Sequence, residues 1–156
     1  MGRLIGVSGA ITAACLAFFA AGTPAWRARE LGHSEIAAWD SSQNVVIRDA
    51  ARFRDAWTQL FPVSAQRPAL PLVDFAKWRV IVVASGTRLT GGYRLALDSG
   101  RVVRDSAMIF VTLRTPARGC AVAEQLTTPA VAIATPVQPA AYRIIFHERA
   151  DNSRCH

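Results

Sequence analysis

The sequence predicts an α+β fold: an antiparallel β-sheet or small sandwich of five to six strands, with one N-terminal amphipathic helix. Three observations predict it. One helical apolar stripe occurs early in the 156 residues. Short β-branched or alternating runs then follow at close spacing, which is typical of strands joined by turns. No helical pattern recurs between these runs, so parallel βαβ units are not expected.

The helix is predicted over residues 48–61, "RDAARFRDAWTQLF". Its apolar residues recur at i, i+3, i+4 and i+7 and are Phe53, Ala56, Trp57 and Leu60. This spacing places them on one stripe that faces a core. Asp49 can cap the first turn, because its carboxylate can accept free backbone amide hydrogens. Pro62 disfavours helical angles at the residue before it and ends the helix.

The strand candidates differ in the burial that they predict. They are residues 44–47, 80–84, 93–97, 101–103, 107–114, 130–134 and 142–147. The continuous apolar run at 80–84 suits a central strand buried on both faces. The alternation at 93–97 suits a half-exposed strand. Ser99-Gly100 is expected to turn the chain between 93–97 and 101–103.

The N-terminal segment 1–25 resembles a secretory signal peptide, with cleavage near residue 22 or 25. Arg3 precedes an uncharged apolar stretch at 4–21. Two alternatives stay open: an uncleaved membrane anchor, because the stretch is nearly long enough to span a bilayer, and a lipoprotein modified at Cys15. Contact with a membrane is expected only in these two cases.

Residues 26–43 are polar and mixed, and are expected to form a linker. Residues 44–156 then form a single domain with a C-terminal tail. Removal of the first 25 residues leaves Cys120 and Cys155, an even number, in an oxidising compartment. A disulfide between them would close a loop of 35 residues and stabilise the domain by about 3–4 kcal/mol. The alternative is two unrelated thiols.

Composition and motifs argue against several functional classes. The net charge is +7, and Lys77 is the only lysine among 18 basic residues. The arginines are scattered, whereas nucleic-acid binding needs a clustered basic face, so no nucleic-acid partner is expected. The chain has no GxSxG, HExxH, P-loop or paired-cysteine spacing. We therefore expect no catalytic residues, no metal site, no cofactor and no enzymatic activity.

The segment "ASGTRLTGGYRLAL" carries the candidate functional site. It joins two strand candidates through a connection that is too long for a two-residue hairpin. A glycine-rich loop needs positive φ angles for its turn, or exposes its backbone to a partner. The candidate protein-binding residues are Arg88, Thr90, Gly91, Gly92 and Tyr93.

A set of short motifs surrounds and includes this segment: Val73-Asp74-Phe75, the strand at 80–84, Gly86, Thr90-Gly91-Gly92-Tyr93, the Pro116–Gly119 step and Thr127-Thr128-Pro129. With these motifs the chain resembles the PrcB C-terminal domain family. The resemblance covers roughly residues 45–136. Cys120 and the tail after Val137 are not part of the family pattern.

The resemblance implies a secreted or periplasmic accessory domain, without catalysis of its own, that binds or stabilises a protease. One alternative is a protease inhibitor that inserts the 88–93 loop into an active-site cleft. Another is a structural, envelope-associated domain whose glycines serve only the turn. A projecting, unpaired loop favours the inhibitor, and a flat loop with Tyr93 buried favours the structural domain.

Overall fold

A computed structural model describes residues 27–151 of the chain. The elements are β1 (Arg29–Ser34), β2 (Ser42–Ile47), α1 (Ala50–Leu60), a 3-10 turn (Ser64–Gln66), β3 (Trp78–Ser85), β4 (Arg94–Val103), β5 (Ser106–Pro116), β6 (Ala130–Pro136) and β7 (Ala141–Asp151). Within these residues, no helix has the length and apolar character needed to cross a membrane.

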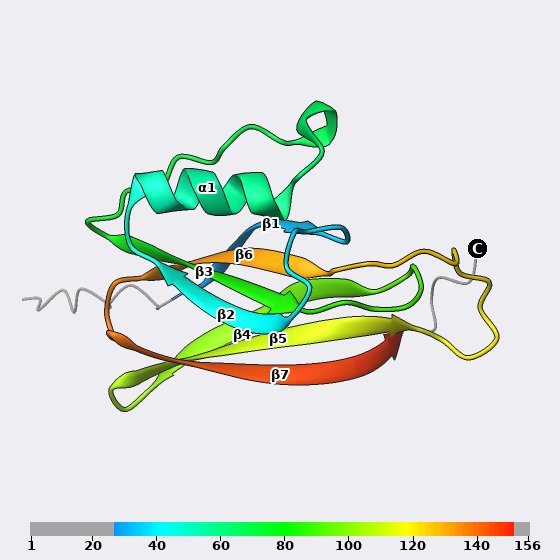
Figure 1. The fold of residues 1–156 in the computed structure, drawn as a ribbon. Coiled ribbons are helices and arrows are strands. Elements are labelled where there is room, and N and C mark those ends of the chain that lie inside the picture. Colours follow the sequence, from blue (N-terminus) through cyan, green and yellow to red (C-terminus); the bar gives the residue numbers. More distant parts are fainter. Residues whose placement is uncertain (1–26, 152–156) are drawn as a thin grey trace, which may run out of the picture.

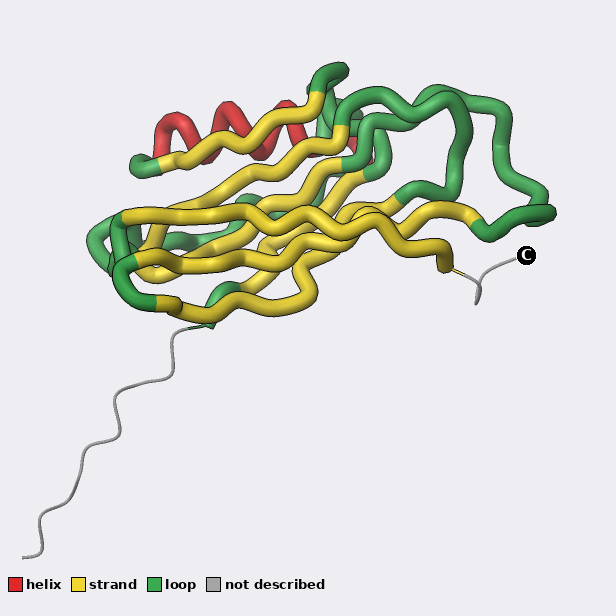
Figure 2. Tube along the Cα trace, turned by 90° about the horizontal axis from the view of Figure 1, so that it is seen from below, coloured by secondary structure: helices red, strands yellow, loops and turns green. Residues whose placement is uncertain are grey.

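The strands form two stacked sheets, and the helix lies on the outer face of one of them (Figure 1). The four-stranded sheet has the order β1-β6-β3-β2, and the three-stranded sheet has the order β4-β5-β7. The view from below in Figure 2 shows the three-stranded sheet in front, with the helix on the far side. The predicted mostly β fold with one helix is therefore confirmed at this coarse level.

Strand β3 lies at the centre of both cores, as its continuous apolar run predicts. Val80, Val82 and Ala84 belong to the cluster beneath the helix. Ile81 and Val83 belong to the cluster between the two sheets. The split follows from the period of two along a strand, which sends alternate side chains to opposite faces.

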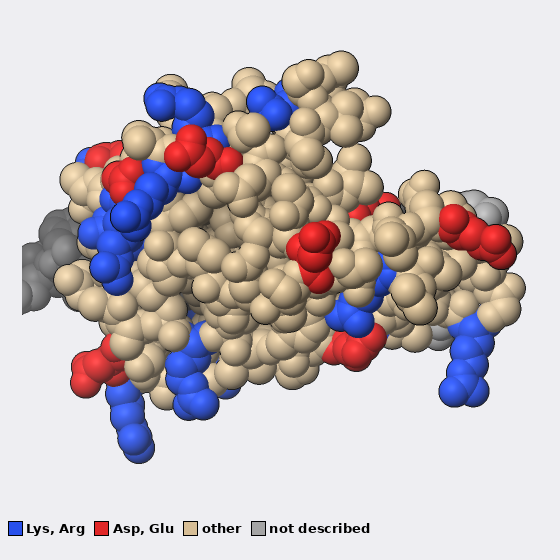
Figure 3. All heavy atoms as spheres, in the orientation of Figure 1, with Lys and Arg blue, Asp and Glu red and all other residues tan. Residues whose placement is uncertain are grey.

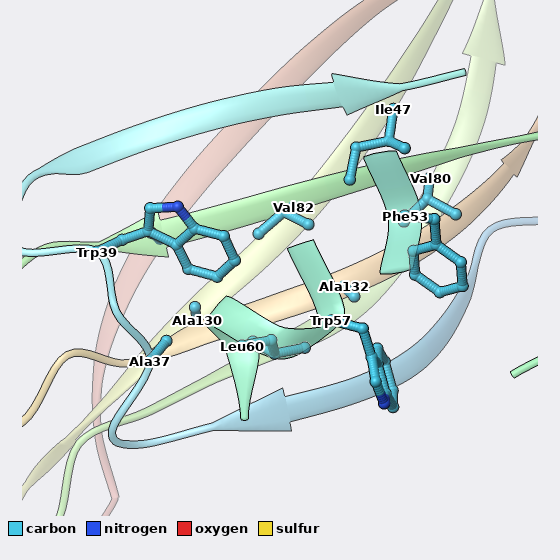
Figure 4. Close-up of a cluster of buried hydrophobic side chains, with 11 residues drawn as sticks. Ala37, Trp39, Ile47, Phe53, Trp57, Leu60, Val80, Val82, Ala130 and Ala132 are labelled. Carbon is cyan, nitrogen blue, oxygen red and sulfur yellow. The ribbon is translucent and has the colours of Figure 1, made fainter. Parts of the chain in front are cut away.

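The helix covers the four-stranded sheet through the predicted stripe. Phe53, Trp57 and Leu60 are buried, and Figure 4 shows them beside Val82 and Ala132 of the sheet. The side chain of Asp49 accepts a hydrogen bond from the Arg52 amide at 2.9 Å, so the predicted N-cap is confirmed. The Trp57 indole also donates to the Pro68 carbonyl oxygen at 3.0 Å.

The segment 26–43 is not a linker, and this sequence-based prediction is wrong. It contains β1, which pairs antiparallel with β6, and it buries Ala37 and Trp39 in the core under the helix. Strand β1 has mostly polar residues and no alternating apolar pattern, although its Leu31 packs against the core under the helix. Glu30 accepts a hydrogen bond from the Leu97 amide of β4 at 3.1 Å.

Two further expectations need correction. The structure has seven strands rather than five or six, because β1 was not predicted. Ser99-Gly100 does not turn the chain: β4 continues through it with a register shift between Leu97 and Ser99, and the turn follows at 104–105. A bulge accommodates an extra residue while pairing continues on both sides.

The sheets are also not wholly antiparallel, because β5 and β7 pair in parallel. The connection between them runs through β6 in the other sheet. The crossover that a parallel pair requires is therefore made by a strand of the opposite sheet, and no helix is needed between the two strands. The absence of a helical pattern correctly excluded βαβ units but not this arrangement.

Candidate protein-binding loops

The candidate site lies in the connection between β3 and β4, residues 86–93. Gly86 opens this connection with a φ of +75°, and a Cβ atom there would lie 2.9 Å from the Ser42 backbone nitrogen. The loop therefore leaves the sheet against the start of β2. Only glycine combines that φ angle with so close an approach of two backbones.

The loop is paired with a second connection, residues 117–129 between β5 and β6. The Arg88 amide donates to the Thr127 carbonyl oxygen at 2.7 Å, and the Thr127 amide donates to the Arg88 carbonyl oxygen at 3.0 Å. The Thr127 hydroxyl donates to the Thr90 carbonyl oxygen at 2.8 Å. Figure 1 shows both connections extending beyond the sheets at the same end of the molecule. We name residues 86–93 and 117–129 together the paired loops.

The two adjacent glycines belong to the base of the paired loops. The Gly91 amide donates to the Ala123 carbonyl oxygen at 2.8 Å, and Gly91 is buried. Gly92 has a φ of +83°, which directs the chain into β4. The turn and the contact with the second loop account for this pair of glycines.

Arg88 and Tyr93 close the loop on its inner side. Tyr93 is half-buried and packs against the apolar cluster between the sheets. The Arg88 guanidinium carbon lies 5.7 Å from the centre of the Tyr93 ring, a distance typical of a cation–π contact. The five predicted residues thus lie together, but Arg88, Gly91 and Tyr93 make internal contacts that support the loop.

The exposed apolar residues of the paired loops were not predicted. Leu89 is 81% exposed and Leu126 is 65% exposed. They lie at opposing positions next to the antiparallel bridge between Arg88 and Thr127. From the sequence alone a single leucine in a loop does not reveal whether it is buried, and the pairing of the two loops was not predictable. We name Leu89 and Leu126 the leucine pair.

Cys120 follows a turn in the second loop, with its amide donating to the Ala117 carbonyl oxygen at 3.2 Å. It is half-buried and is not a free thiol. Cys155 lies outside the described residues, as do the N-terminal segment and Cys15. The bond between Cys120 and Cys155 therefore stays a prediction.

The described residues present dispersed charges. On the face in Figure 3, basic and acidic side chains stand in several small groups, separated by broad areas without charge. Within residues 27–151, no three His, Cys, Asp or Glu side chains gather in a way that would hold a metal ion. The exposed apolar feature of this end of the molecule is the leucine pair on the paired loops.

One family model matches part of the chain. Residues 79–136 match the model of the family described as PrcB C-terminal. The resemblance found in the sequence is confirmed over this part, and residues 45–78 lie outside the match. No curated protein and no solved structure matches the chain. The matched part runs from β3 to β6 and includes both of the paired loops.

Proposed function

We propose that this chain, with a PrcB C-terminal domain match over residues 79–136, is a non-catalytic protein-binding domain that acts outside the cytoplasm. In this proposal its partner is a secreted or periplasmic protease, which it accompanies and stabilises. The observation that carries the proposal is the leucine pair, 81% and 65% exposed on two loops that are hydrogen-bonded to each other.

Leaving two leucine side chains in water costs free energy that a partner can recover by covering them. Burying a leucine side chain is worth roughly 1.5–3 kcal/mol, so two exposed side chains represent a large gain for a partner that covers them. Hydrogen bonds to Thr127 and Ala123 already order the loop backbone. A preordered loop loses little conformational entropy on binding, which favours affinity.

The pairing of the loops bears on the inhibitor alternative. A loop that enters a protease cleft needs free backbone groups on both sides of the inserted residue. Here the amide and the carbonyl of Arg88 are used by Thr127, and the amide of Gly91 is used by Ala123. These backbone groups of the first loop are thus bonded to the second loop. This favours docking of the loop's side chains on a protease surface over insertion of its backbone into the active-site cleft.

A purely structural role explains the glycines but not the leucine pair. Gly92 is accounted for by its φ of +83°, and Tyr93 by its contact with the core. Leu89 neither enables a turn nor packs against the core, because its side chain is 81% exposed. Neighbouring exposed apolar side chains on loops are typical of a surface that a partner covers.

The test is a crosslinking pulldown from the cell envelope and culture medium of the source organism. The baits are the wild-type chain, the double variant Leu89→Ser/Leu126→Ser and the control Leu72→Ser. Leu72 is 96% exposed but lies in the connection between the 3-10 turn and β3. We expect a protease with the wild type and with the control, and at least a tenfold lower recovery with the double variant. Recovery of no protease, or equal recovery with all three baits, contradicts the proposal.

An activity assay separates the accessory from the inhibitor. The captured protease is measured alone and after addition of the wild-type chain. An accessory domain prolongs the proteolytic activity at elevated temperature, because a ligand that binds only the folded state stabilises it. A dose-dependent loss of activity would instead identify an inhibitor.

A further inference from the structure

A pocket beside the paired loops contains two arginines in register. It has a volume of about 260 Å³ and is lined by Glu35, Gly92, Arg94, Arg114, Pro116 and Val122. Arg94 begins β4 and lies directly opposite Arg114 of β5. Residues directly opposite each other in neighbouring strands project from the same face, so both arginine side chains reach this pocket.

The side chain of Arg94 carries a donor that lacks an acceptor. Its Nε atom is buried and has no hydrogen-bond partner among the described residues. A buried N–H group is almost always hydrogen-bonded, so such a group needs an explanation. An acceptor supplied from outside the chain would satisfy the Nε–H of Arg94, and the pocket is the space from which it can approach.

The charges of the pocket define the ligand. Arg94 and Arg114 place two positively charged side chains on the pocket, and a concentration of positive charge attracts an anion. Guanidinium groups match the planar geometry of a carboxylate through paired N–H donors. Glu35 also lines the pocket, and its negative charge disfavours a doubly charged group such as phosphate more than a singly charged carboxylate.

The size and the walls of the pocket also favour a carboxylate as the ligand. A volume of about 260 Å³ is below the range of typical small-molecule and cofactor sites, and it suits one side chain or chain end. Pro116 and Val122 supply apolar wall atoms, which suit the methylene groups next to a carboxylate. Gly92, at the exit of the first loop, lines the pocket as well, so the pocket adjoins the paired loops.

We propose that the Arg94–Arg114 pocket binds a carboxylate of the partner protein, either an acidic side chain or a chain terminus. This inference deepens the proposed function and rests on it for the nature of the partner. The leucine pair then supplies apolar contact, and the pocket supplies a charged contact that fixes the orientation of the partner. The pocket itself can be tested without the partner.

The test is a titration of the full chain, in which the ¹H–¹⁵N signal of the Arg94 Nε–H group is monitored. The first probe is N-acetyl-glutamic acid amide, whose only carboxylate is on the side chain. The second is N-acetyl-alanine, whose only carboxylate is the chain terminus. N-acetyl-glutamine amide is the neutral control, and inorganic phosphate is the anion control. We expect a saturable shift with at least one of the two carboxylate probes, and whichever binds tighter identifies the source.

Two variants test the residue. Arg94→Gln should weaken the binding of the carboxylate probe by about tenfold or more, since a hydrogen bond to a charged group is worth roughly 1.5–3 kcal/mol. Because this variant lacks the Nε–H group, its binding is followed on the backbone amides of residues 92–94, which also report folding. Arg143→Gln removes the same charge from β7, opposite Met108, and should bind as the wild type does.

Four results would overturn the inference. The first two are the absence of a saturable shift with either carboxylate probe and an equal response to the neutral glutamine probe. The other two are unchanged affinity in a folded Arg94→Gln protein and stronger binding of phosphate than of both carboxylates. Capture of a protease through the leucine pair would survive any of these results, so failure of the pocket and failure of the proposed function are distinguishable.

Discussion

The helix-covered side of the molecule and the paired loops use the same residue types in opposite ways. On the helix side Phe53, Trp57 and Leu60 are at most 3% exposed and contact one another or the sheet. At the paired loops two leucines are exposed, although their neighbours Arg88 and Thr127 exchange two backbone hydrogen bonds. The comparison teaches that burial serves stability on one side, while the other side is ordered without burial, as the proposed binding of a partner requires.

The largest effect is expected from Phe53→Ala. The side chain is 2% exposed and its ring contacts those of Trp57 and Phe75. Its removal leaves a cavity and should lower the free energy of unfolding by about 3–5 kcal/mol. Urea denaturation followed by tryptophan fluorescence measures this. A loss below about 1 kcal/mol would contradict the claim that burial on the helix side stabilises the fold.

The second-largest loss of stability is expected at Gly86, where a steric clash adds to the cost of a positive φ angle. Gly86→Ala and Gly119→Ala both place a side chain at positive φ, which costs about 1–2 kcal/mol. At Gly86 the new Cβ would also lie 2.9 Å from the Ser42 nitrogen, whereas at Gly119 nothing lies within 4 Å. We expect Gly86→Ala to be more destabilising by about 1–3 kcal/mol. Equal values from thermal unfolding would show that β2 yields to the new atom.

A smaller effect is expected from the helix N-cap. Asp49→Ala removes the acceptor for the Arg52 amide and leaves a free donor in the first turn. The free energy of unfolding should fall by about 1 kcal/mol. Asp49→Ser restores an acceptor and provides the matched control in the same denaturation experiment. A full loss in both variants would assign the effect to charge rather than to capping.

The smallest effect on stability is expected at the leucine pair. Leu89→Ser and Leu126→Ser change exposed side chains that make no core contact. Each should alter the free energy of unfolding by no more than about 0.5 kcal/mol. A larger loss, measured by differential scanning calorimetry, would mean that the two leucines stabilise the loops, and it would remove the contrast with the helix side.

Much of the fold was predictable, because its signals are local. The stripe with Phe53 and Trp57, the cap at Asp49 and the doubly buried run at 80–84 each depend on neighbours in sequence. Strand β1 was missed because its sequence, RELGHS, lacks an alternation of apolar and polar residues. It is held in part by a hydrogen bond from the Leu97 amide of β4 to the side chain of Glu30, and residues so far apart in sequence give no local signal. The parallel pairing of β5 with β7 depends on the path of the whole chain, so no local pattern indicates it.

The candidate site was predictable only as a segment. The glycines of residues 88–93 point to a special backbone, and the structure places Gly92 at positive φ. Which side chains face outward depends on the pairing of Arg88 with Thr127, 39 residues later in the chain. The register of Arg94 with Arg114 likewise depends on the path of β4 through its bulge.

The most direct measurement places a photocrosslinking amino acid at position 89 in one protein and at position 72 in another. Both positions carry exposed leucines in the wild type, 81% and 96% exposed, but only Leu89 belongs to the paired loops. After irradiation with envelope and medium fractions, we predict a crosslink to a protease from position 89 and none from position 72. A crosslink from position 72 alone, or none from position 89, would contradict the claim that the paired loops bind the partner.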